Sequence, residues 1–164
     1  MLSNVTAISV DTAVLVTGIS KRTLWRRIAQ GQLVKLGEDT RGRARVCIKE
    51  LAQLSRAFWS PDEVAMFVDA DAGDAMAKAD LGAALYLQSR LRDAFRLFLD
   101  AAEAGSADAA HWLASCYSHG HGTARDDEAA LFWLERAALR RHPIAREQLR
   151  QLSATCQGDA VHAG

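Results

Sequence analysis

Residues 105–145 read GSADAAHWLASCYSHGHGTARDDEAALFWLERAALRRHPIA, and parts of this stretch recur elsewhere in the 164-residue chain. Its opening, residues 105–109, resembles residues 73–77 and, more weakly, residues 141–145. Alanines at 77, 109 and 145 are 32 and 36 residues apart, and leucines at 81, 113 and 149 keep the same spacing. A period of this length is typical of helical repeat proteins, in which each unit is buried by stacking on its neighbours.

Each repeat is predicted to contain two helices joined by a short loop. We expect helices over residues 74–88, 91–103, 107–118 and 126–139, preceded by a helix at 62–70 and followed by one at 144–153. Alanines at matched positions let paired helices approach closely, and leucine and aromatic side chains fill the space between them. Trp112 and Trp133 are therefore interpreted as core residues rather than as a ligand cage.

The pattern of the second unit resembles the Sel-one-like repeat, a relative of the tetratricopeptide repeat. The residues that carry the resemblance are Ala109, Leu113, Tyr117, Gly120-His121-Gly122, Asp126, Ala130, Trp133 and Ala137-Ala138. The first unit keeps Leu81-Gly82, Ala94, Ala101-Ala102 and Gly105, but its loop is four residues shorter. The resemblance implies an α-solenoid that serves as a protein-interaction scaffold.

The first 57 residues have a different pattern. Ser9 and Ser20 are predicted helix N-caps, and Gly18 breaks the chain between a helix at 9–16 and a second helix at 21–30. Residues 33–36 and 43–46 predict a hairpin around a glycine-containing loop, and residues 48–58 predict a third helix. Two short helices joined by about three residues form a helix-turn-helix, to which the hairpin would add a wing.

This segment resembles the winged helix-turn-helix of MerR-like and excisionase-type proteins. The resemblance rests on Ala13, Leu15, Thr17-Gly18-Ile19-Ser20, Arg22-Thr23-Leu24, Ile28, Gly31-Gln32-Leu33, Arg43 to Val46 and Leu51. It implies that residues 21–28 enter a DNA major groove and that the wing, residues 37–43, contacts a minor groove or phosphates. Glu38 and Asp39 would then point sideways. The candidate DNA-binding residues are Lys21, Arg22, Thr23, Arg26, Arg27, Arg41, Arg43 and Arg45.

Charge is divided unevenly along a chain whose formal net charge is zero. Residues 1–57 hold ten basic and four acidic side chains, whereas residues 58–164 hold ten basic and sixteen acidic ones. The two parts therefore face different partners: double-stranded DNA for the basic head and a protein for the acidic repeats. Because one small head covers little DNA, we also expect a homodimer. The alternative is an adaptor whose helix-turn-helix contacts a protein rather than DNA.

Catalytic and metal chemistry are weakly indicated. Cys116, His119 and His121 lie within six residues, but no fourth zinc ligand is evident, and Cys116 is expected to pack inside a helix pair. Asp126, Asp127 and Glu128 stand at a helix start, where acidic groups favour the helix dipole. With no nucleotide-binding or serine-nucleophile motif either, we expect no cofactor, no metal and no enzymatic activity.

The expected fold is mainly α: a small winged helix-turn-helix domain followed by a short α/α solenoid of helix-pair repeats. The domains are residues 1–57, a connecting helix at 58–72, the repeats at 73–153 and a flexible tail at 154–164. Three scattered cysteines and the absence of a long apolar run or export signal predict a cytoplasmic protein. Together these features predict a bacterial transcriptional regulator whose acidic repeat domain binds protein or dimerises.

Overall fold

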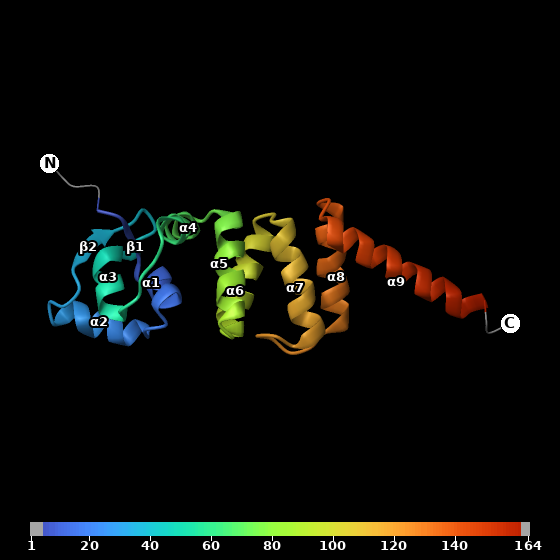
Figure 1. Ribbon diagram of the computed structural model, residues 1–164, viewed down its shortest axis with the longest axis horizontal. Coiled ribbons are helices and arrows are strands. Elements are labelled where there is room, and N and C mark those ends of the chain that lie inside the picture. Colours follow the sequence, from blue (N-terminus) through green and yellow to red (C-terminus); the bar gives the residue numbers. More distant parts are fainter. Residues whose placement is uncertain (1–4, 162–164) are drawn as a thin grey trace. The chain divides into compact units, whose positions relative to one another are not determined.

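The computed structural model describes residues 5–161, with side chains up to residue 154 (Figure 1). The described residues form two compact units, one ending at Ala77 and the other beginning at Lys78. The fold is mainly helical, as predicted.

The N-terminal unit combines four helices with a small sheet. Its elements are β1 (Ala7–Ser9), α1 (Val10–Thr17), α2 (Lys21–Ala29), β2 (Lys35–Glu38), β3 (Ala44–Cys47), α3 (Ile48–Ser55) and α4 (Pro61–Ala72). The predicted caps are present: Ser9 and Ser20 accept hydrogen bonds from the backbone of Thr12 and Thr23, and Gly18 ends α1 with φ 70°. Helix α3 ends three residues earlier than predicted, because Arg56 adopts a left-handed conformation.

The sheet contains one strand that the sequence analysis missed. Strands β2 and β3 form the expected hairpin, and β1 pairs antiparallel with the other side of β3, which gives the order β1-β3-β2. All three residues of β1 are buried. A strand of three residues is too short to show an alternating pattern, so its sequence carries no distinct signal.

Helix α4 packs on the N-terminal unit rather than serving only as a connector. It starts with a capping box between Ser60 and Glu63 and ends at Gly73, which has φ 107°. Near its end, the buried Asp71 hydrogen-bonds to Ser9 and Thr12. The structure therefore groups the predicted connecting segment, residues 58–72, with the head.

The second unit holds the repeat helices within about one residue of their predicted bounds. They are α6 (Leu91–Glu103), α7 (Ala107–His119) and α8 (Asp127–Leu139). Helix α5 (Ala75–Leu87) precedes them and begins three residues before Lys78, the first residue of the second unit. Phe98, Leu85 and Leu113 are among the fully buried side chains, and Trp112 stacks on Phe98. The two tryptophans are thus packed with the repeats, since Trp133 is also buried.

Helix α9 (Pro143–Val161) is longer than predicted. It continues through residues 154–161, part of the segment 154–164 that the sequence analysis assigned to a flexible tail. Residues 162–164 lie outside the described residues. No helix within residues 5–161 is long and apolar enough to cross a membrane.

The repeats are nearly neutral, which corrects the expectation of an acidic repeat domain. Residues 73–153 hold ten basic and eleven acidic side chains. Most of the acid excess instead lies in residues 58–72, which hold four acidic side chains and no lysine or arginine. Helix α4, which packs on the basic head, therefore carries most of this charge.

Candidate functional site

Helices α7, α8 and α9 enclose a groove of about 550 Å³ within the repeat unit. Its apolar lining comes mainly from alanines and leucines of all three helices: Ala114, Ala130, Leu131, Leu134 and Leu152. Polar side chains stand among them: His111, Ser115, Ser118, His119, Asp127, Gln148 and Gln151. An apolar lining with a few polar groups is the usual make-up of a site that holds a side chain or a small molecule.

Histidine side chains form part of the groove and its support. His111 donates from Nε2 to Gln148 Oε1 over 3.1 Å and stacks on His142, with ring centroids 4.4 Å apart. Burial, and then the neighbouring His142, lower the pKa of His111. The buried His142 accepts a hydrogen bond from the backbone of Ala145 at Nδ1 and so caps the start of α9. His111 is therefore uncharged at neutral pH and acts as a hydrogen-bond donor.

The cluster of Cys116, His119 and His121 is not arranged as a metal site. Cys116 is fully buried, and this burial raises the pKa of its thiol to about 11. His119 Nδ1 lies 2.9 Å from the Ser115 carbonyl oxygen, while His121 Nδ1 lies 2.6 Å from the Tyr86 hydroxyl. Among the described residues, no group of three or more His, Cys, Asp or Glu side chains is placed to hold a metal ion. The side chains serve packing and loop attachment.

The predicted DNA-binding residues on α2 fall into two groups. Arg22 and Arg26 are exposed, and neither forms a side-chain hydrogen bond or ion pair within the described part of the chain. The others have partners inside the protein: Lys21 pairs with Asp11, Thr23 contacts the Ser20 hydroxyl, and Arg27 donates to Gln32. Leu24 is buried on the opposite side of the helix, as its spacing predicts.

The wing arginines are held by the protein itself. Asp39 accepts hydrogen bonds from the backbone of Arg41 and Arg43 and forms an ion pair with the Arg43 side chain over 2.7 Å. The backbone hydrogen bond from Arg43 is the main cause of the lowered pKa of Asp39. Asp39 therefore shapes the turn of the wing. The sequence had suggested only that its side chain points sideways.

The arginine side chains of the wing also reach α4 and β1. Arg43 donates to the Asp71 carbonyl oxygen and pairs with its carboxylate over 3.2 Å, and Arg41 donates to the Ala72 carbonyl oxygen over 3.4 Å. Arg45 donates to the Ala7 carbonyl oxygen. The structure thus gives all three a role in the fold. No local pattern in the sequence marks Asp71, because its partners lie 28 to 62 residues away.

Comparison with known proteins identifies the repeat. The model of the Sel1 repeat matches residues 107–142, which comprise α7, α8 and the turn that follows. The chain is also similar to a Sel1 repeat protein from Oxalobacter formigenes, with 30% identity and a TM-score of 0.49 over 64% of this chain. The matched region is 33% of that protein's chain, so the present chain spans about a third of its length. No curated protein matches. Residues 107–142 are thus a Sel1 repeat, as the resemblance implied.

Proposed function

We propose that this protein is a non-enzymatic interaction adaptor whose repeat unit binds a segment of another protein. Sel1 repeats point to protein interaction as the role of the second unit. The observation that carries the proposal is the groove between α7, α8 and α9, where an apolar floor lies beside hydrogen-bonding groups. A leucine-sized side chain of the partner would enter the floor, while the imidazole and amide groups would bind the backbone of the same segment.

Peptide selection with the full-length chain tests this proposal. A phage-displayed library of random peptides is panned on the protein, and the enriched peptides are then titrated by fluorescence anisotropy. Leu131, which lines the groove, is replaced by Asp, and Leu87→Asp serves as the control because Leu87 is exposed on α5 and does not line the groove. We expect loss of binding only for Leu131→Asp. A library that yields no binding peptide contradicts the proposal.

A second function, binding of double-stranded DNA by the N-terminal unit, is favoured by one specific observation. Arg22 and Arg26 lie four residues apart on α2, are exposed and have no partner among the described side chains. In the winged helix-turn-helix arrangement this surface would face the major groove. The wing contributes less, since Arg43 and Arg45 are bound within the protein, while the exposed Arg41 makes only a 3.4 Å hydrogen bond to the Ala72 carbonyl oxygen.

Salt-dependent binding distinguishes DNA from a protein partner of the head. Affinity for a random duplex is measured across a series of salt concentrations for the wild type, for the double variant Arg22→Gln/Arg26→Gln, and for the control Arg92→Gln on α6. If both α2 arginines contact phosphates, the slope of log affinity against log salt falls by about 2 in the double variant. If the wild-type protein binds no duplex at low salt, this result supports an adaptor in which both units bind protein. Homodimerisation stays a prediction, checked by sedimentation of the same samples.

A further inference from the structure

A second cavity, of about 420 Å³, opens between α8 and α9 at the end of the repeat unit. Ala138, Leu139 and Leu149 supply its apolar lining, while Glu135 and Arg146 add charged groups. Leu139, at the end of α8, is 83% exposed, so its side chain is accessible to a partner. The cavity is distinct from the α7–α8–α9 groove, because the two share no lining residue.

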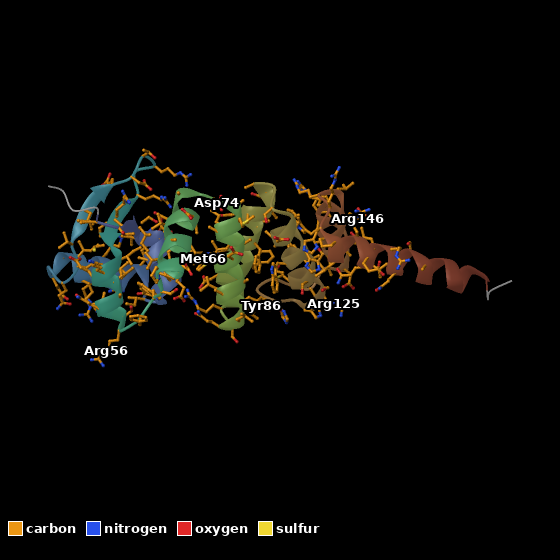
Figure 2. All side chains as sticks on the ribbon, turned by 45° about the horizontal axis from the view of Figure 1, so that its top comes forward. Arg56, Met66, Asp74, Tyr86, Arg125 and Arg146 are labelled. Carbon is orange, nitrogen blue, oxygen red and sulfur yellow. The ribbon has the colours of Figure 1, made fainter. Side chains whose placement is uncertain are left out.

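Basic residues outnumber acidic ones in the segment of chain that borders this cavity. Residues 135–152 contain five arginines and two acidic residues, Glu135 and Glu147, and Arg146 is the arginine in the lining itself. Arg150 pairs with Glu147, and Arg136 lies over the rings of Phe132 and Trp133. The other three arginines are Arg140, Arg141 and Arg146. They are exposed, and none of them forms an ion pair within the described part of the chain. Arg146 lies on the first turn of α9 (Figure 2).

The backbone at Arg141 adopts a conformation that favours glycine. In the repeat register, residue 141 corresponds to Gly73 and Gly105, which have φ values of 107° and 105°. Arg141 occupies the same turn with φ 66°. A side chain is disfavoured in this region because its Cβ crowds the backbone, and non-glycine residues kept there are often functional. The chain thus places an arginine where its own repeats use glycine.

We infer that the α8–α9 cavity, with Arg146 in its lining and with Arg140 and Arg141 directly after Leu139 in the chain, binds an acidic protein segment that carries an aliphatic side chain. This inference rests on the proposed protein-interaction function and names the chemistry of the partner. The aliphatic group would enter between Leu139 and Leu149, and the partner's carboxylates would pair with the arginines around it. Nucleic acid fits less well, since the residues that line the cavity include no aromatic ring for base stacking.

Three labelled peptides test the chemistry on the full-length protein. The first alternates glutamate and leucine, the second replaces each glutamate by lysine, and the third replaces each leucine by serine. We expect binding of the first peptide, weakened by salt, and much weaker binding of the other two. Arg140→Gln/Arg146→Gln should weaken binding of the first peptide by about fivefold or more, whereas Arg92→Gln, which removes an exposed arginine of α6, should not.

The substitution Arg141→Gly separates binding from stability. Because glycine relieves the left-handed backbone, the melting temperature of the repeat unit should rise by about 2–4 °C. Affinity for the glutamate–leucine peptide should nevertheless fall. If the Arg141→Gly variant binds the peptide with unchanged affinity, Arg141 is not part of the binding site.

Several outcomes overturn the inference while leaving the adaptor proposal intact. One such outcome is equal binding of the glutamate and lysine peptides. Another is that the peptides selected from the random library all bind at the Leu131 groove and none at the α8–α9 cavity. Tighter binding of duplex DNA than of the peptide, lost in Arg140→Gln/Arg146→Gln, assigns the arginines to nucleic acid instead. Failure of the library to yield any binder contradicts the adaptor proposal itself.

Discussion

At the scale of single residues, Asp71 has an unusually large share of the polar contacts of the N-terminal unit. Its Oδ1 accepts hydrogen bonds from the Ser9 and Thr12 hydroxyls, both 2.6 Å away, and its Oδ2 accepts one from the Ser9 backbone at 2.9 Å. Arg43 supplies the opposite charge. A carboxylate that is buried in this way is tolerated because every side of it has a donor.

Replacing Asp71 by Ala should therefore destabilise the N-terminal unit by about 3 kcal/mol, because the buried donors and Arg43 lose their acceptor. Amide hydrogen exchange at Ile8 and Val46, which pair in the sheet, should then be roughly a hundredfold faster. Asp69→Ala is the matched control, since Asp69 is exposed on the same helix. Exchange rates that match in the two variants would show that the Asp71 contacts contribute little.

Cys116 is a residue whose burial predicts low reactivity. Because burial raises the pKa of its thiol from 9.0 to about 11, its thiolate fraction at pH 8 is about a hundredfold smaller than that of an ordinary cysteine. Alkylation of native Cys116 should be slower by at least this factor than after unfolding. Peptide mapping by mass spectrometry separates it from Cys47, which is half-buried.

The same shift fixes the sign of a pH effect on stability. Between pH 9 and pH 11 the unfolded thiol releases its proton while the folded thiol keeps it, so the free energy of unfolding of the repeat unit decreases as pH rises. Below pH 9 both states are protonated and the contribution is fully present. Denaturant unfolding of Cys116→Ser across this range should show a shallower decrease than the wild type. If the free energy of unfolding falls equally with pH in both proteins, the pKa of the Cys116 thiol is not raised by folding.

At the scale of elements, the α7–α8 loop is attached to the repeat before it. His121 bonds to Tyr86 of α5, and Asp126 donates from its backbone to the Tyr117 carbonyl oxygen. Gly122 lies against the first residue of α6: a Cβ added there would be 2.2 Å from the Leu91 carbonyl oxygen. The loop therefore joins neighbouring repeats, and a glycine is needed for close approach as well as for its φ of 79°.

Gly122→Ala should accordingly displace the loop and lower the melting temperature of the repeat unit. We expect a loss of about 1–3 kcal/mol, seen by circular dichroism, because the backbone of α6 has to shift. Gly105→Ala provides the control: its φ of 105° is strained as well, but its added Cβ meets nothing within 4 Å. The difference between the two variants measures the contact of the loop with α6.

At the scale of the whole molecule, the boundary between the units governs which fragments are stable. Since α4 contributes Asp71 to the head, and Arg41 and Arg43 donate to the carbonyl oxygens at its end, the head requires residues beyond 58. The fragment 1–58 should melt at a lower temperature than the fragment 1–77, as followed by circular dichroism. Superimposable melting curves would show that the head folds without α4.

Local signals in the sequence predicted the helices of the repeat unit and most helix starts. Alanine and leucine spacing, serine caps and glycines after helices are local signals, read from residues within one or two turns of one another. For the same reason α6, α7 and α8 lie within about one residue of their predicted bounds. The Sel-one-like resemblance likewise rested on such spacing and agrees with the Sel1 match at residues 107–142.

Which charged side chains remain available for a partner depends on contacts between distant parts of the chain. Arg22 and Arg43 are equally basic in the sequence, yet Arg22 is exposed without a partner on α2, whereas Arg43 is held by Asp39 and by the distant Asp71. Strand β1 also exists only because β3 pairs with it. Contacts across tens of residues depend on how the chain closes on itself, and no local pattern records them.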